Sequence, residues 1–290
     1  MNNLQQVRRK LKLITFDVTG TLLNFKIPVG KQYAEAGSKY NVHVDSDLLN
    51  EAFLKSWKHM NETHPNYGFS CNMTWESWWH QLVQRTFVTA APSMEFDAES
   101  SKKISHYLTE VFRESECWEL CDGAVDILED LKMSGMPVGV ISNSDPRLEE
   151  VLINMKIRNY FNFVIASYTV GVEKPHSEVF KLAMNLFSDK TLKHHEILHV
   201  GDSPTLDFQA ALNAGWNACL VDPNRTFSIL PYSPDRQSKH SSSIYRMTVK
   251  NLHELRTEEE IGIENLLEVE IPSDLKEKFE KLTVESLNDQ

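Results

Sequence analysis

An aspartate ends the first apolar segment of the chain, next to residues suited to phosphoryl chemistry. Asp17 directly follows the β-prone run 11–16, and Thr19, Gly20 and Thr21 come after it. Glycine lets the backbone approach a ligand closely, and the two threonines add hydroxyl groups beside the carboxylate. This pattern is typical of a carboxylate nucleophile that faces a phosphoryl group. An aspartate that only caps a turn at the end of a strand gives the same local pattern.

Other chemically active side chains follow later apolar runs of the same kind. Ser142 and Asn143 come directly after a predicted buried strand. Lys174 precedes a predicted helix, and Asp202 follows another predicted strand. Ligands of open parallel sheets bind at the carboxyl ends of the strands. We therefore expect these side chains to meet the first aspartate at one edge of a sheet.

A carboxylate that attacks a phosphate dianion must overcome repulsion of about 4 kcal/mol per charge pair at 4 Å near a protein surface. A divalent cation offsets this repulsion, and Mg²⁺ prefers oxygen ligands. We expect Asp17, Asp202 and the backbone carbonyl of Thr19 to hold the ion. Asp207, five residues after Asp202, is expected to orient Lys174 or to support the ligands of the ion.

The phosphoryl oxygens of a substrate need partners of their own. The ammonium group of Lys174 would neutralise their remaining charge. The hydroxyl groups of Thr21 and Ser142, together with Asn143 and nearby backbone N–H groups, would hold a phosphoryl oxygen in line for attack. The expected partner is therefore a small phosphorylated molecule.

Alternating strand and helix patterns must position these residues. From residue 120 onward, short apolar runs alternate with segments of helical periodicity, which predicts an α/β protein with a parallel sheet covered on both faces. Residues 245–255 are expected to form a last strand or helix of the same domain. The predicted strands are 11–16, 137–141, 163–165, 197–200 and 216–221, and the predicted helices include 123–134, 147–155 and 206–214.

A long helical segment separates the first strand from this alternation. Its apolar residues recur at helical spacing, and strand signals are sparse. We predict a helical cap domain at 27–117, inserted into a core domain formed by 1–26 and 118–256. Its aromatic stripes are interpreted as helix-bundle core, with Asn66, Tyr67 and Trp79 as candidates for a surface that faces the substrate.

Composition limits the function classes. The 290 residues carry a net charge of −11, which argues against a nucleic-acid or anionic-membrane surface. No apolar run approaches the ~20 residues that span a membrane. Four cysteines are few for this length and indicate a reducing, intracellular compartment, with the cytoplasm as the expectation and the nucleus and mitochondrion left open. The sequence does not fix the oligomeric state.

Two polar segments near the C-terminus fall outside the predicted sheet. Residues 224–243 are rich in Ser, Pro and basic residues, which is typical of a long surface loop. Residues 257–290 form an acidic extension in which Leu275, Phe279 and Leu282 suggest one short amphipathic helix. A solvated or weakly docked extension is expected.

Histidines near the predicted strands invite a metal-site interpretation, which we do not adopt. His194 and His195 precede a predicted strand, and His199 lies within it. Surface or packing roles are expected for all three. His176 is expected to pack at the start of a helix.

Taken together, the motifs resemble the haloacid dehalogenase superfamily of hydrolases over about residues 10–255. The similarity is carried by residues 16–22, 141–143, 174–175 and 201–207, and the helical insert is similar to the type-one cap of that family. The resemblance implies a Rossmann-like three-layer core. It also implies phosphoryl transfer through an aspartyl-phosphate, with Mg²⁺ as cofactor.

Position 19 departs from the family pattern. Phosphatases of the family place there a second aspartate that protonates the leaving oxygen, whereas this chain has Thr19. Because general acid–base help contributes about 10²–10⁴ in rate, we expect a phosphatase-like enzyme with low or narrow activity. Two alternatives stay open: a catalytically silent protein that binds a ligand or a protein, and a dehalogenase, whose halide leaves without a proton.

Overall fold

The computed structural model describes residues 11–187, 189–224, 226 and 246–256. Six of its strands form one parallel sheet in the order β5-β4-β1-β6-β7-β8. Their bounds are β1 Leu13–Phe16, β4 Val138–Ser142, β5 Phe163–Ala166, β6 Ile197–Gly201, β7 Asn217–Val221 and β8 Arg246–Val249. β1 lies between β4 and β6, where the strand order reverses, so its carboxyl end occupies the position at which such sheets bind ligands.

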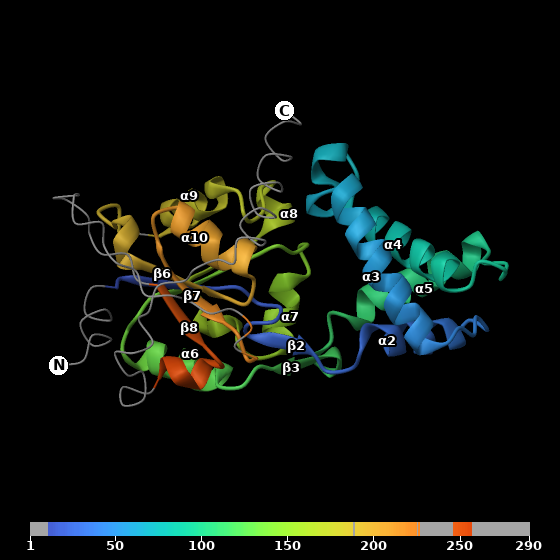
Figure 1. Cartoon of the computed structure of the whole chain (residues 1–290), viewed down its shortest axis with the longest axis horizontal. Coiled ribbons are helices and arrows are strands. Elements are labelled where there is room, and N and C mark those ends of the chain that lie inside the picture. Colours follow the sequence, from blue (N-terminus) through green and yellow to red (C-terminus); the bar gives the residue numbers. More distant parts are fainter. Residues whose placement is uncertain (1–10, 188, 225, 227–245, 257–290) are drawn as a thin grey trace.

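Helices cover both faces of the sheet, which confirms the predicted α/β class (Figure 1). One face packs against α6 (Ala124–Met133) and α7 (Leu148–Asn154). The other packs against α9 (Ser177–Leu186) and against α10 (Ala210–Asn213), which continues from the π-helical turn η5 (Pro204–Gln209). The predicted helix 206–214 is therefore two elements, and the first is wider than an α-helix.

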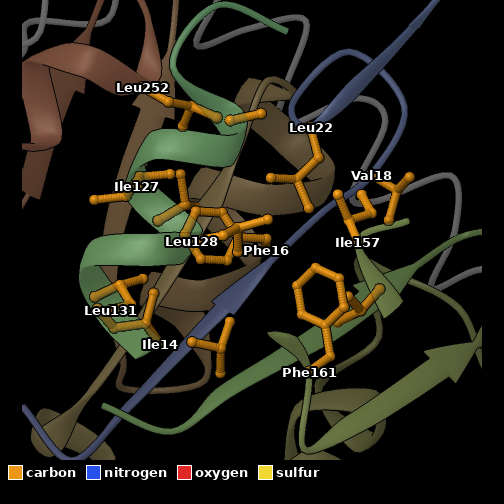
Figure 2. Close-up of a cluster of buried hydrophobic side chains, with 14 of the residues drawn as sticks. Ile14, Phe16, Val18, Leu22, Ile127, Leu128, Leu131, Ile157, Phe161 and Leu252 are labelled. Carbon is orange, nitrogen blue, oxygen red and sulfur yellow. The ribbon is translucent and has the colours of Figure 1, made fainter. Parts of the chain in front are cut away.

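Side chains of β1 point alternately to the two covered faces of the sheet, which explains why three of its four residues are apolar. Ile14 and Phe16 point into one cluster with Leu128 and Phe161 (Figure 2), whereas Leu13 packs into the cluster on the opposite face. A strand covered on both faces cannot show the alternation of apolar and polar residues that marks a half-exposed strand. Each such fully buried side chain stabilises the fold by about 1.5–3 kcal/mol.

The helices between β1 and α6 form a separate lobe beside the sheet, here called the helical lobe (Figure 1). It contains α2 Val29–Ser38, α3 Ser46–Thr63, η1 Asn66–Cys71, α4 Trp75–Ala90 and α5 Ala98–Val111. Asp45, Thr74 and Asp97 begin α3, α4 and α5, where each accepts hydrogen bonds from backbone N–H groups of the first turn. Tyr33 and Phe87 are buried at the centre of the lobe, as the aromatic stripes predict.

A short antiparallel pair connects the helical lobe to the sheet domain. β2 (Leu23–Phe25) pairs with β3 (Trp118–Leu120), one strand on each side of the lobe in the sequence. Neither strand was predicted, because three residues are too few to show a strand period. We retain the division into 1–26 with 118–256 and 27–117 as a proposal.

The C-terminal predictions are only partly within the described residues. Residues 245–255 were expected to form a strand or a helix, and the chain forms both β8 and the 3₁₀ turn η6 (Leu252–Leu255). Apart from positions 224 and 226, the predicted loop 224–243 lies outside the described residues, as do the tail 257–290 and residues 1–10. No helix within the described ranges has the length and apolar character to cross a membrane.

Candidate active site

Lys174 joins two carboxylates at the carboxyl edge of the sheet. Its Nζ donates to Oδ1 of Asp17 at 2.7 Å and to Oδ1 of Asp207 at 2.6 Å. Only 2% of Lys174 and 8% of Asp17 is exposed, so this ion-pair network is shielded from solvent. The structure thus brings together two acids and an amine from segments more than 30 residues apart in the sequence, as the motifs predict.

Asp202 completes a cluster of three carboxylates with Asp17 and Asp207. One oxygen of each lies within 4.8 Å of the others. Thr21 donates a long hydrogen bond of 3.4 Å to Asp202 Oδ1. Gly20 has a φ of +85°, and a Cβ atom there would lie 2.4 Å from Asp202 Oδ2. Glycine is therefore needed at this position both for the turn and for the close approach of the aspartate.

His199 belongs to the same network, although we predicted only a surface or packing role for it. Its Nε2 lies 3.0 Å from Asp207 Oδ1, and its Nδ1 lies 2.8 Å from the Thr15 hydroxyl, in the neighbouring register position of β1. Burial lowers the pKa of His199, which favours a neutral ring, and a neutral ring beside the Asp207 carboxylate would donate from Nε2. A polar residue inside the apolar run 197–201 is the signal that sequence reasoning missed, since a buried polar group needs a partner.

Asn143 and Ser142 end β4, the strand beside β1. The Asn143 side chain holds the backbone of Lys174, donating to its carbonyl and accepting from its N–H, both at 2.8 Å. Asn143 therefore positions the lysine directly, a role that we did not predict. Ser142 is buried at the end of the same strand. Their predicted contacts with a substrate stay predictions.

Charge and burial shift the ionisation of the site. Burial raises the pKa of Asp17, and the Lys174 ammonium only partly offsets that effect. Burial alone would lower the pKa of Lys174, but the carboxylates of Asp17 and Asp207 outweigh it and raise the pKa. Burial, reinforced by the negative charges of Asp17 and Asp207, raises the pKa of Asp202 to about 6. Three carboxylates around one ammonium leave an excess of negative charge.

This excess fits a divalent cation held by oxygen atoms. Asp207 is already engaged, because Oδ1 binds Lys174 and His199 and Oδ2 accepts from the Ser203 N–H at 2.9 Å. Asp17 has one oxygen on the lysine, which leaves the other for an ion, and Asp202 lies beside it. Asp17 and Asp202 are thus the side chains suited to hold Mg²⁺, whereas the oxygens of Asp207 are occupied by Lys174, His199 and Ser203.

Thr19 lies on the open side of this network. It is exposed, and with Val18 it lines a cavity of about 350 Å³ between the sheet edge and the helical lobe. Tyr67 and Trp79 line the same cavity from the lobe, whereas Asn66 binds the sheet domain by donating to the Ser167 carbonyl at 3.1 Å. The residue expected to limit proton transfer is therefore beside the space open to a substrate.

Hydrogen bonds attach the helical lobe to the sheet edge at the cavity. The Tyr67 hydroxyl donates to the Asn143 carbonyl at 3.1 Å, and Trp79 Nε1 donates to Asp145 Oδ2 at 2.8 Å. On the opposite side of the site, His176 begins α9 by accepting from the Glu178 N–H, which agrees with its expected role at a helix start.

Comparison with known proteins decides the family. A family model for haloacid dehalogenase-like hydrolases matches residues 11–215. The chain belongs to this family. The matched haloacid dehalogenase-like region contains each of the carboxylates of the cluster, together with Lys174 and the entire helical lobe.

Individual relatives agree with this assignment. The chain is 38% identical over 238 residues to rhythmically expressed gene 2 protein of Drosophila melanogaster, covering 80% of this chain and 91% of the relative. It is 33% identical over 214 residues to haloacid dehalogenase-like hydrolase domain-containing protein 3 of Bos taurus, covering 74% of this chain and 83% of the relative. A magnesium-bound crystal structure of the putative hydrolase YfnB from Bacillus subtilis has the same fold, with a TM-score of 0.60 at 17% identity over 84% of this chain and 96% of that chain.

Proposed function

We propose that this member of the haloacid dehalogenase-like hydrolases is a Mg²⁺-dependent, phosphatase-like enzyme with low or narrow activity on a small phosphorylated molecule. The observation that carries the proposal is the ammonium of Lys174, held between Asp17 and Asp207 with Asp202 beside them. A buried nucleophile, a fixed positive charge and an anionic cluster suited to an ion are the parts that phosphoryl transfer needs.

Asp17 is the proposed nucleophile. Its carboxylate attacks phosphorus, the bond from phosphorus to the leaving oxygen breaks, and an aspartyl-phosphate forms. Water then attacks phosphorus, which releases inorganic phosphate and restores the carboxylate. Lys174 keeps Asp17 oriented and neutralises phosphoryl charge, while the hydroxyl groups of Thr21 and Ser142 and the polar end of β4 at Asn143 position the phosphoryl group.

Mg²⁺, when bound by Asp17, Asp202 and the Thr19 carbonyl, would supply positive charge that lowers the repulsion between nucleophile and phosphate. The excess of carboxylates over ammonium groups supports this cofactor. The magnesium in the similar Bacillus subtilis structure agrees with it.

Thr19 sets the limit on activity. A threonine hydroxyl is too weak an acid to protonate a departing alkoxide at neutral pH, so leaving groups that are stable as anions are favoured. Wild-type protein with Mg²⁺ should hydrolyse aryl phosphates weakly and alkyl phosphates more weakly still. Thr19→Asp should raise alkyl phosphatase activity by about 10²-fold or more. Thr63→Asp, at an exposed position of α3, is the matched control and should change neither rate.

The same assay separates the alternatives. Unchanged turnover in Asp17→Asn would end the assignment of the nucleophile. Chloride release from a 2-chloroacid without metal would identify a dehalogenase instead. Absence of turnover with either substrate, with binding of a phosphate mimic retained, would identify a silent binding protein.

A further inference from the structure

The cavity beside Thr19 is lined mainly by apolar side chains, and its aromatic rings fall into two groups. The first group comes from the connection between the domains, where Phe25 lies 4.6 Å from Trp118 and 5.6 Å from Phe112 between ring centroids. The second comes from the helical lobe, where Trp57 lies 5.7 Å from Trp79. We call this space the aromatic cavity. Its lining favours an apolar ligand because burial of apolar surface contributes about 25 cal/mol per Å².

The charged groups of the aromatic cavity are already paired. Among the described residues that line it, Arg147 is the sole cation and Asp145 the sole anion. Arg147 Nε and Nη2 donate to the two oxygens of Asp145 at 2.9 and 2.6 Å, and both side chains are less than a tenth exposed. This bidentate arrangement is the one in which arginine and carboxylate satisfy each other best.

The remaining surfaces of Arg147 are also covered. Nη1 donates to the Thr109 carbonyl at 3.0 Å. The rings of Trp75 and Trp79 lie 5.0 and 4.9 Å from the guanidinium carbon. Asp145 in turn accepts from the Trp79 indole. A second anionic group on a substrate would have to break this network to reach the guanidinium, and burying a charge without a partner is costly.

Thr19 restricts the substrate from the other side. It lies where the aromatic cavity meets the end of β1, so a leaving oxygen that departs toward the cavity would find no acid at position 19 to protonate it. An alkoxide is a poor leaving group under these conditions, whereas an aryl oxide is a good one. The lining and the missing acid therefore select the same kind of molecule.

We propose that the substrate is an aryl phosphate: a phosphate monoester whose leaving oxygen carries an uncharged, apolar ring that occupies the aromatic cavity. This inference rests on the proposed function. Asp17 forms the new bond to phosphorus, the bond from phosphorus to the aryl oxygen breaks, and its electron pair leaves on that oxygen, which solvent later protonates. Hydrolysis of the aspartyl-phosphate consumes one water molecule and needs no other reactant.

The test compares three substrates in the presence of Mg²⁺. Acetyl phosphate, whose carboxylate leaves without protonation, reports on the phosphatase chemistry alone. 2-Naphthyl phosphate supplies the apolar ring, and its 6-carboxy derivative supplies the same ring with one added charge. We expect kcat/KM for 2-naphthyl phosphate to exceed that of the 6-carboxy derivative by at least about 30-fold, because the charge has no free partner in the aromatic cavity.

Two lysine substitutions on α3 sharpen the test. Leu54 lines the aromatic cavity and is 60% exposed, whereas Leu48 is 50% exposed on the same helix and does not line the cavity. Leu54→Lys provides a cation at the cavity and should reduce the preference against the carboxylate by about two- to fivefold. Leu48→Lys should leave the preference unchanged, and both variants should fold because both positions face solvent.

Each result that contradicts a proposal also shows which of the two proposals is wrong. Turnover of acetyl phosphate with equal kcat/KM for the two naphthyl compounds would overturn the aryl-phosphate inference and leave the phosphatase proposal standing. An equal effect of Leu48→Lys and Leu54→Lys would also overturn it, since the cavity would then play no part. Failure of wild-type protein to turn over any of the three phosphates would overturn both proposals.

Discussion

The charged site at the end of β1 and the aromatic cavity beside it meet at Thr19, yet they treat charge in opposite ways. In the site, three carboxylates surround the single ammonium of Lys174, so negative charge is left in excess. In the cavity, Arg147 and Asp145 neutralise each other completely. We therefore expect the first region to attract a cation and a phosphoryl group, and the second to accept a neutral group.

The difference separates the tasks of reaction and selection. Asp17 and Asp202 directly follow strands of the sheet, which fixes their positions to the core. Both domains line the aromatic cavity, but its rings lie on the helical lobe and its connection, which share no sheet with the core. Substitutions in the two regions should therefore affect different properties.

The largest effect is expected from Asp17→Asn. An amide cannot attack phosphorus, so turnover of 2-naphthyl phosphate should fall by at least about 10³-fold. Binding of the product 2-naphthol, measured by calorimetry, should persist because the aromatic cavity is untouched. Asp47→Asn, an exposed change on α3, is the control and should alter neither quantity. Loss of naphthol binding in Asp17→Asn would show that the two regions are not independent.

Lys174→Met should affect stability as strongly as activity. The substitution leaves Asp17 and Asp207 buried without their shared cation, and removal of one partner of a buried ion pair costs about 3–5 kcal/mol. Urea denaturation of metal-free protein measures the change in the free energy of unfolding. Lys181→Met, on the exposed side of α9, should change it by less than about 0.5 kcal/mol. Similar values for the two variants would contradict the burial argument.

His199→Phe tests the part of the network that the sequence did not predict. The aromatic ring should keep the contact with Phe180, while Asp207 and Thr15 lose a hydrogen-bond partner. We expect a loss of about 2 kcal/mol in stability and a smaller kcat, with KM for the naphthyl substrate unchanged. A change confined to KM would place His199 in substrate binding instead.

The smallest expected difference between the two regions is in the pH dependence of ligand binding. Asp202 must be ionised to hold the ion. Because its pKa is raised to about 6, protons compete with Mg²⁺ for the carboxylate below pH 6. Apparent affinity should therefore weaken by up to about tenfold for each pH unit below 6 and level off above it. Binding of 2-naphthol should not change over the same range. Mg²⁺ affinity that is constant from pH 5 to 7 would contradict the role of Asp202.

Sequence reasoning could bring Asp17 and Asp202 together because both directly follow strands. A strand pattern fixes where Asp17 and Asp202 emerge, and parallel pairing brings those ends together. For the aromatic cavity the sequence offered only Tyr67 and Trp79 as candidates, since helical periodicity gives the same signal for core and for a cavity wall. The pairing of Asp145 with Trp79 joins residues 66 positions apart, and no local pattern specifies such a contact.

A glycine of the fourth motif shows a second limit of prediction from sequence. From the sequence, Gly201 was only part of a motif. In the structure a Cβ atom at this position would clash with Asp207, 2.1 Å from its Cγ. The tight packing of strand end and following turn is visible only once η5 is placed beside β6. Similarly, the unpredicted β2 and β3 are too short for a periodic signal and depend on pairing across the entire helical lobe.

The distribution of tryptophan gives the protein an intrinsic optical probe. Of its six tryptophans, Trp57, Trp79 and Trp118 line the aromatic cavity. An aromatic guest in that space would lie against several indole rings at once and change their emission without any attached label. Occupancy could thus be followed in real time by ultraviolet fluorescence.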